Sequence, residues 1–300
     1  MLHNDRDVFE QMILKVSEET GIEAGIIEKD YYVTLFLKRI VELQPNIIFK
    51  GGTSLSKCYK IINRFSEDID LSIDTNNNPT ESQRKKLKEN IISVINEFGF
   101  VLDNADNVRS RRYYNRYIID YMSVFSSNVI KEHLIVETAV YIKAYPYENL
   151  QATSLIYDYL RKNGYFDLIT EYGLEPFEVN VQSASRTFVD KLFALGDYYI
   201  SGIVQEHSRH LYDLYKLSDI VVIDNKLKKL VKEVFEERKV HEQCHSAKDG
   251  IDMNALLQEI IDNDVYKKDY ENITAKLIFE EVSYNDVIKR LQEIVDCNLF

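Results

Sequence analysis

The sequence predicts an α/β (α+β) fold in which a small mixed sheet is followed by a helical C-terminal domain. Mainly apolar runs that suit buried strands occur at 47–49 and 134–142, and apolar residues alternate with polar ones at 68–73, as in a strand with one buried face. From Pro146 onward the pattern turns mainly helical, with apolar residues spaced three or four positions apart. We therefore expect two domains, 1–145 and 146–300, and a chain of 300 residues with 45% hydrophobic residues is long enough for both.

Two helices are predicted before the first strand. Apolar residues recur at helical spacing between Asp5 and Glu19, and Gly21 is suited to end that helix. A second helix is expected from about Ala24 to Leu43. We interpret both helices as scaffold for the domain 1–145.

The composition limits the partners and the compartment. The formal net charge is −12, whereas non-specific affinity for nucleic acid comes from Lys and Arg that displace counterions. Any RNA partner must therefore be held by a local basic patch. No apolar run approaches the ~18 residues that a membrane span needs. The first residues resemble no signal or transit sequence, so we expect a cytoplasmic protein with no membrane partner.

The segment 49–73, FKGGTSLSKCYKIINRFSEDIDLSI, carries the strongest motifs. Gly51 and Gly52 follow the first strand and allow a sharp turn with close approach of a ligand. Thr53 and Ser54 are good N-caps for a following helix, whose apolar face would be Leu55, Tyr59 and Ile62. A strand, a glycine turn and a helix N-terminus together present backbone N–H groups, which suits phosphate.

The second half of this segment supplies carboxylates. Asp68 and Asp70 alternate with apolar residues, so both share one strand face, about 7 Å apart along the strand. Two such carboxylates can reach a pair of divalent cations, and phosphate oxygens complete the coordination of Mg²⁺. The alternative for each half alone is an ordinary turn and a solvated strand face.

Joined by one helix, the two halves resemble the signature of the DNA polymerase β-like nucleotidyltransferases. More narrowly, GGTSLSKCY followed by RFSEDIDL resembles the AbiEii family of nucleotidyltransferase toxins, as does IEKDYYVTLFLK near the N-terminus. The resemblance implies nucleotidyl transfer from a nucleoside triphosphate with Mg²⁺ or Mn²⁺. It also suggests an RNA acceptor, with the tRNA 3′ end as the best choice, and a cognate antitoxin protein.

A third metal ligand is expected from the strand 134–142, LIVETAVYI. Glu137 lies within an otherwise apolar run, where a buried carboxylate needs a partner. Polymerase β-like sites use a third carboxylate from a neighbouring strand, so the resemblance makes Glu137 the candidate. The alternative is a surface strand on which Glu137 faces water.

Two further site residues follow from the resemblance alone. RTFVDKLFAL and RHLYDLYKL resemble the downstream motifs of the AbiEii family, in which a lysine and a later aspartate belong to the active site. This implies that Lys191 contacts the triphosphate and that Asp213 orients it or binds the second metal. Without the resemblance, Asp213 and Arg209 would be read as an ordinary i,i+4 ion pair.

The expected site therefore has three parts. Asp68, Asp70, Lys191 and Asp213 are the predicted catalytic residues, and Glu137 joins the two strand aspartates as a metal ligand. Arg64 and Ser66 flank the carboxylate strand and are expected to position the loop. The predicted nucleotide-binding residues are Gly51, Gly52, Thr53, Lys57, Ser66 and Lys191.

The densest basic patch is RSRRYYNRY at 109–117, where tyrosines lie between the arginines. Basic and aromatic side chains together suit the ends of nucleic-acid strands, which makes this patch a candidate RNA site. A hairpin strand with arginines in water and tyrosines packed beneath is the alternative. The candidate RNA contacts are Arg109, Arg111, Arg112 and Arg116.

Two alternatives to RNA modification remain at this stage. One keeps the chemistry and changes the acceptor to a protein hydroxyl. The other is a nucleotide-binding interaction module without turnover.

Overall fold

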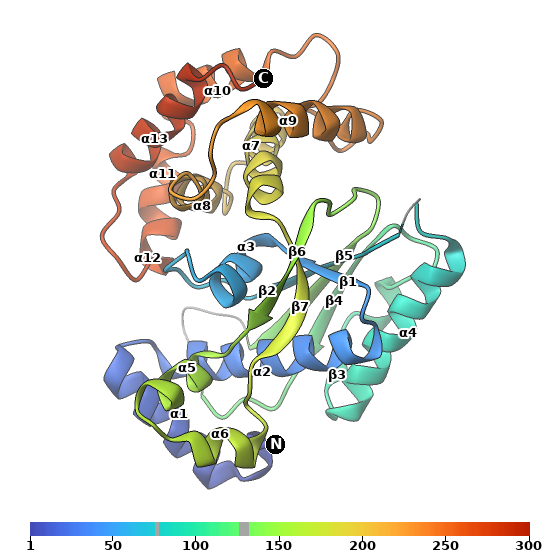
Figure 1. Cartoon of the computed structure of the whole chain (residues 1–300), viewed down its shortest axis with the longest axis vertical. Helices are drawn as coiled ribbons and strands as arrows, with labels where there is room; N and C mark the ends of the chain where they lie inside the picture. The colour runs from blue at the N-terminus through green and yellow to red at the C-terminus, as the bar shows by residue number, and fades with distance from the viewer. Residues whose placement is uncertain (76–77, 126–131) are drawn as a thin grey trace. The chain divides into compact units, whose positions relative to one another are not determined.

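The computed structural model describes residues 1–75, 78–125 and 132–300 (Figure 1). The chain forms two compact units. The first comprises Met1–Tyr59 and Ser66–Val181, and the second comprises Lys60–Phe65 and Gln182–Phe300. The main division therefore follows residue 181, whereas the predicted domain boundary follows residue 145. The difference arises because the strands and helices between 147 and 181 pack with the first unit.

The described residues form a mixed sheet of seven strands in the order β3-β4-β5-β2-β1-β7-β6 (Figure 1). β1 runs antiparallel to β2 and parallel to β7, β2 runs parallel to β5, and β4 runs antiparallel to both β3 and β5. This mixed sheet confirms the predicted fold class. The strands are β1 (Ile47–Lys50), β2 (Asp68–Ile73), β3 (Val101–Leu102), β4 (Tyr114–Asp120), β5 (His133–Ala139), β6 (Tyr147–Ala152) and β7 (Phe177–Gln182).

The first two helices, α1 and α2, begin and end close to their predicted positions. The Asp5 side chain caps α1 by accepting from the Val8 N–H, and Gly21 ends it in the left-handed conformation. α2 ends before Pro45, as predicted. The helices are α1 (Arg6–Thr20), α2 (Ala24–Leu43), α3 (Gly51–Ser54), α4 (Glu81–Glu97), α5 (Leu155–Lys162) and α6 (Phe166–Tyr172).

The two faces of the sheet differ in chemistry. Ile69, Leu71 and Ile73 of β2 belong to one buried hydrophobic cluster with residues of α2 and α4. Alternation in the strand then turns Asp68 and Asp70 to the other face. The pattern DIDLSI therefore does what the sequence predicts, with apolar side chains in the core and both carboxylates on the opposite side.

The helix after the glycines starts earlier than predicted. α3 begins at Gly51 itself, with Lys50 as its N-cap, and continues through a π-helical turn, η2 (Leu55–Tyr59). Thr53 and Ser54 are thus buried residues inside the helix, not caps, and Ile62 lies beyond its end. The reason is that Gly51 adopts φ 76°, so the chain turns from the strand into the helix at once.

The second unit is helical over its longer segments. α8 packs against α7 and α13, and α10 also contacts both of these helices. Phe188, Leu192 and Leu195 of α7 are fully buried, as their helical spacing predicts. The helices are α7 (Ala184–Ile200), α8 (Arg209–Leu217), α9 (Asn225–Arg238), α10 (Met253–Asp262), α11 (Lys267–Asp269), α12 (Ala275–Leu277) and α13 (Tyr284–Asp296).

The segment 60–65 belongs to this helical unit although it lies between two motifs of the first unit. Arg64 forms an isolated antiparallel bridge with Ile278, and the Phe65 N–H donates to the Leu277 carbonyl. The chain therefore enters the second unit before the carboxylate strand and leaves it again.

Within the described residues, none of the helices combines the length and the apolar character needed to cross a membrane.

Candidate active site

A row of charged residues crosses the polar face of the sheet. Lys50 of β1 lies opposite Asp70 of β2, Asp70 lies opposite Glu137 of β5, and Glu137 lies opposite Arg116 of β4. Residues directly opposite on neighbouring strands point to the same side. The row therefore has a cation at each end, and the two carboxylates occupy its centre.

The glycine motif and the carboxylate motif meet at Gly51. A Cβ on Gly51 would overlap the Asp70 carboxylate, and Gly51 has φ 76° as well. Only glycine therefore fits at this position, for reasons of both space and backbone conformation. The two halves of the segment 49–73 form one site, with the Asp70 carboxylate against the start of α3.

Glu137 is held at the edge of this site. Its carboxylate lies 3.5 Å from Arg116 Nε, and its side chain is 26% exposed. Burial, followed by the charge of Glu137, raises the pKa of Tyr114 above its ordinary value. Glu137 is thus neither a buried carboxylate without a partner nor a fully solvated one.

A divalent cation on this face of the sheet needs ligands besides the carboxylates. In 1–75, 78–125 and 132–300, no three or more His, Cys, Asp or Glu side chains are grouped so that they could hold a metal ion. Mg²⁺, however, is usually held by one or two carboxylates together with substrate phosphates and water. Asp68 and Asp70 share a face, with Glu137 opposite Asp70, so the donors fit a cation that arrives with a nucleotide.

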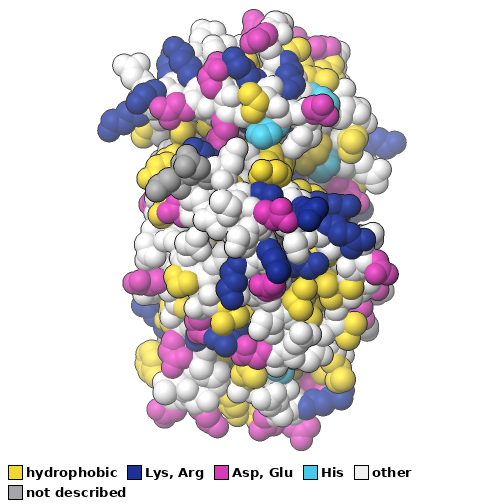
Figure 2. Space-filling view, turned by 90° about the vertical axis from the view of Figure 1, so that its right-hand side faces the viewer, with side chains coloured by type: hydrophobic (Ala, Val, Ile, Leu, Met, Phe, Trp, Pro, Cys, Tyr) yellow, Lys and Arg dark blue, Asp and Glu magenta, His cyan; other side chains and the backbone are white. Residues whose placement is uncertain are grey.

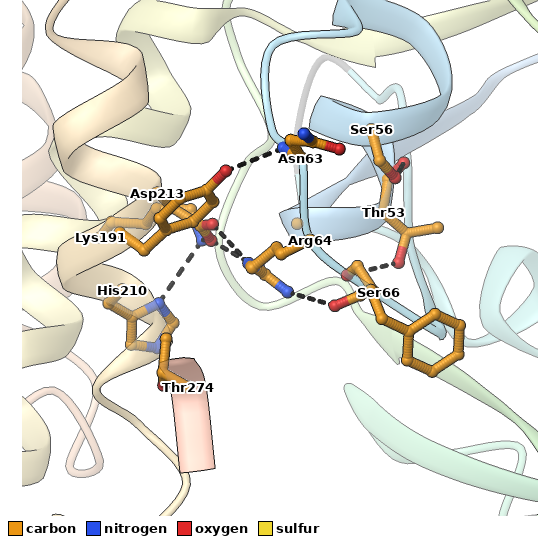
Figure 3. Close-up of polar contacts among 12 residues, drawn as sticks. Thr53, Ser56, Asn63, Arg64, Ser66, Lys191, His210, Asp213 and Thr274 are labelled. Carbon is orange, nitrogen blue, oxygen red and sulfur yellow. Dashed lines mark hydrogen bonds and ion pairs between the residues drawn. The ribbon is translucent and has the colours of Figure 1, made fainter. Parts of the chain in front are cut away.

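Thr53, Ser66 and Lys57 of the segment 49–73 form hydrogen bonds within the first unit. The hydroxyls of Thr53 and Ser66 are hydrogen-bonded at 2.9 Å, which links α3 to the residues before β2 (Figure 3). Lys57 is buried, and its ammonium donates to the Asp30 carboxylate and to the Thr34 hydroxyl. In the structure the partners of Lys57 are thus Asp30 and Thr34 of α2. A contact between Lys57 and phosphate stays a prediction.

A second charged cluster lies within the helical unit (Figure 3). Asp213 on α8 accepts from Arg64 Nε and Nη2, both at 2.7 Å, and from Lys191 Nζ of α7 at 2.5 Å. His210 Nδ1 lies 3.5 Å from the same ammonium. The sequence-predicted pair Lys191 and Asp213 is thus brought together, with Arg64 as a third member.

Burial and charge act against each other in this cluster. Burial alone would raise the pKa of Asp213, but Arg64 and Lys191 outweigh it and hold that pKa well below its ordinary value. Burial, with Arg64, lowers the pKa of Lys191 despite the nearby carboxylate. Burial and the charge of Lys191 also lower the pKa of His210. Two cations share one carboxylate here, so an anion would be favoured.

The sequence predicts only that Arg64 positions a loop, whereas the structure pairs its guanidinium with Asp213. A usable signal exists, because Asp213 lies in the apolar helix sequence LYDLYKL and a buried carboxylate requires a cationic partner. The identity of that partner is a non-local property. Lys50, opposite Asp70, was missed for the same reason.

The predicted basic patch is exposed and mixed with acidic groups. Arg111 pairs with Glu81, and the Arg84 guanidinium lies 4.1 Å from the Tyr113 ring centroid. Tyr113 and Tyr114 are both partly exposed, whereas Tyr117 is buried in the core. The patch therefore has one packed tyrosine and two accessible ones, and its contact with RNA stays a prediction. Figure 2 shows basic and acidic side chains interspersed on one face of the molecule.

A mixed sheet with a glycine helix start beside two strand carboxylates defines a nucleotidyltransferase-like α+β fold. The model of the family described as nucleotidyl transferase AbiEii toxin, type IV toxin–antitoxin system, matches residues 35–296. The chain therefore belongs to this family. No curated protein matches the sequence.

Proposed function

We propose that this protein transfers a nucleoside monophosphate from a nucleoside triphosphate to an acceptor hydroxyl of RNA, with the tRNA 3′ end as the first acceptor to test. The observation that carries the proposal is the contact of Asp70 with Gly51, because it joins a carboxylate pair to a glycine helix start. Phosphate and its cation need these two elements side by side.

In the proposed reaction, the acceptor oxygen forms a bond to the α-phosphorus while the bond from that phosphorus to the bridging oxygen breaks. Pyrophosphate leaves and the hydroxyl proton is released. Asp68, Asp70 and Glu137 would hold divalent cations, Mg²⁺ or Mn²⁺, which supply charge stabilisation to the attacking and leaving oxygens. The backbone amides of Gly51, Gly52 and Thr53 would bind phosphate oxygens.

The helical unit contributes a phosphate-binding cation in this proposal. Arg64 and Lys191 share the single carboxylate of Asp213, and burial together with the neighbouring positive charge lowers the pKa of Lys191. A triphosphate would neutralise this positive charge. Asp213 then acts as the residue that orients Lys191 and Arg64, because three N–H donors already engage its carboxylate oxygens.

The exposed patch of Arg109, Arg111, Arg112 and Arg116 is the proposed contact for the RNA backbone. A chain with net charge −12 needs such a local patch. Partly exposed Tyr113 and Tyr114 offer ring faces on which bases can stack. We expect the protein to act in the cytoplasm, where a cognate antitoxin of the type IV system would oppose it.

The test offers α-³²P-labelled triphosphates with Mg²⁺ or Mn²⁺ to total RNA and to total protein from a bacterial lysate. Label on RNA of tRNA size that disappears with Asp70→Asn supports the proposal. Label on protein alone would replace the acceptor by a protein hydroxyl. Binding of triphosphate with no transfer to either pool would indicate an interaction module and overturn the proposed activity.

A further inference from the structure

Three consecutive charged residues of α2, Glu28, Lys29 and Asp30, contact three separate segments of the first unit. Successive residues of a helix point about 100° apart, so neighbours in sequence reach different directions. Glu28 and Lys29 are fully buried. The sequence pattern identifies this helix only as scaffold, and its buried charges need a further explanation.

Lys29 reaches the residue next to the first metal-site carboxylate. Its ammonium pairs with the carboxylate of Glu67, which directly precedes Asp68. The Lys29 side chain is fully buried, while Glu67 is 25% exposed. The start of β2 is therefore tied to α2 by an ion pair, one residue from Asp68.

Asp30 reaches the glycine helix. One carboxylate oxygen accepts from Lys57 Nζ, and the other accepts from the Leu155 N–H at 2.7 Å. Lys57 also donates to Thr34 Oγ1, one turn along α2, at 2.6 Å. The turn that follows α3 is thus fixed to the same helix as the start of β2.

Glu28, the first of the three charged residues of α2, contacts the loop after β4. Its carboxylate accepts from the Ser123 hydroxyl and from the Val124 and Phe125 N–H groups after β4. Burial raises the pKa of Glu28, although these three donors oppose the shift. The hydrogen bonds of Glu28 fix the loop after β4, whereas those of Lys29 and Asp30 reach the two site motifs, so Glu28 serves as a contrast to its two neighbours.

Buried ion pairs seldom add net stability, because desolvation of both charges offsets their attraction. The contribution that we infer for these two pairs is geometric, since charged partners accept few alternative arrangements. Lys29 and Asp30 each contact one of the two segments that must lie side by side for Gly51 to accommodate Asp70.

We propose that Lys29 and Asp30 are positioning residues for nucleotidyl transfer, with Lys29 acting through Glu67 on Asp68 and Asp30 acting through Lys57 on α3. In this assignment Lys57 is an anchor of α3 and not a phosphate ligand. The inference rests on the proposed function, since it concerns the geometry of the same carboxylates. It goes beyond that function by placing the control of this geometry on α2.

The experiment measures Mn²⁺ affinity without nucleotide, from the EPR signal of unbound Mn²⁺. Wild type is compared with Lys29→Met, Glu67→Gln, Asp30→Asn and Lys57→Met. We expect each variant to weaken Mn²⁺ binding by about tenfold, the lower end for residues that orient metal ligands. The matched control is Lys38→Met, because Lys38 is also on α2 and donates to the Gly173 carbonyl. It should leave the affinity unchanged.

Folding is monitored by circular dichroism, and the double variant Lys29→Met/Glu67→Gln keeps the test decisive if a single variant unfolds, because it removes both charges and leaves neither buried alone. The two possible roles of Lys57, phosphate ligand and anchor of α3, predict different results for Lys57→Met. If Lys57→Met weakens triphosphate binding and leaves nucleotide-free Mn²⁺ binding intact, the anchor assignment is overturned. The double variant Asp30→Asn/Lys57→Met should be less impaired than the sum of its single changes.

The inference and the proposed function fail in different ways. If wild type binds no Mn²⁺ with or without a non-hydrolysable triphosphate, or Asp70→Asn binds it equally well, the metal site itself is contradicted. If Mn²⁺ binding requires Asp70 but is unaffected by Lys29→Met, Glu67→Gln and Asp30→Asn, the positioning inference alone is overturned.

Discussion

The carboxylate face of the sheet and the Arg64–Asp213–Lys191 cluster combine the same charges in opposite environments. On the sheet, the Arg116 and Glu137 side chains are 48% and 26% exposed and lie 3.5 Å apart. In the helical unit, the side chains of Arg64 and Asp213 are 2% and 0% exposed and form a bidentate pair. Groups of the first kind can change partners, whereas groups of the second kind are part of the core.

This difference in exposure determines whether a charged residue contributes mainly to ligand binding or also to the stability of the fold. An exposed pair is worth little to folding, so its carboxylate can turn to an arriving cation at small cost. A buried pair is costly to break, because the remaining charge stays without compensation. We therefore expect the sheet carboxylates to matter for binding and transfer, and Asp213 to matter for stability as well.

The largest effect on stability is expected for Asp213→Asn. The change leaves Arg64 and Lys191 as two buried cations without their carboxylate, which should lower the free energy of unfolding by about 3–5 kcal/mol. Chemical denaturation measures this quantity. Glu137→Gln is the comparison variant on the exposed side, and an equal effect there would remove the distinction between the two regions.

Lys191→Met should affect nucleotide use more than folding. Arg64 continues to pair with Asp213 through two hydrogen bonds, so the carboxylate keeps a cation. Removal of a charged phosphate ligand should raise the KM for triphosphate about 10- to 100-fold. Lys191→Arg should recover part of this effect, since lysine binds phosphate as a point charge. Normal turnover at limiting nucleotide would exclude Lys191 from the site.

Arg111 and Arg112 are more exposed than the sheet carboxylates, and the side chain of Arg111 is 85% exposed. Replacing both by Ala should weaken RNA binding and reduce the slope of log affinity against log salt by about 0.7–0.9 for each phosphate that the protein no longer neutralises. Titration of RNA at two salt concentrations measures the slope, and nucleotide binding serves as the control. An unchanged slope would move the RNA site elsewhere or favour a protein acceptor.

A smaller effect concerns pH and the ring stack beside the buried cluster. His207 stacks on Tyr198 at 3.4 Å between ring centroids, and burial, with the charge of Arg209, lowers its pKa to about 4. The unfolded chain binds that proton near its ordinary pKa of about 6.5. Between these values the unfolded state holds more protons, so stability falls as the pH falls.

His207→Phe retains a ring on Tyr198 and removes the titrating group. The dependence of the unfolding free energy on pH should therefore become flatter between pH 6.5 and 4. Identical slopes for both proteins would assign this pH dependence to other groups.

Local patterns predicted much of the architecture. Alternation in β2 identified which side chains enter the core, and helical spacing with Gly21 identified α1 and α2. The helix start at Gly51 was wrongly assigned, because Thr53 and Ser54 satisfy cap preferences although glycine makes the turn. Capping preferences describe each residue alone. At this position the positive φ of Gly51, which residues with a side chain rarely adopt, decides where the helix starts.

The partners of charged residues were the part that sequence could not supply. The sequence contains Lys57 and Asp30, and Arg64 and Asp213, but each pair forms only when distant segments pack together. For the same reason the allocation of 60–65 to the helical unit was not predictable, since the segment is short and lies between two motifs of the other unit. The orientation of Asp68 and Asp70 could be predicted, because alternation along the strand alone determines to which face of the sheet their side chains point.

The central claim is that the sheet carboxylates perform the chemistry and are dispensable for the fold. The most direct test measures nucleotidyl transfer and the melting temperature of Asp68→Asn and Asp70→Asn beside wild type. We expect transfer to fall by more than about a hundredfold in each variant, the upper scale for residues that only support a metal site. The melting temperature should shift by less than about 2 °C, as for substitutions outside the core. Transfer near the wild-type rate in either variant, with the melting temperature unchanged, would contradict the claim.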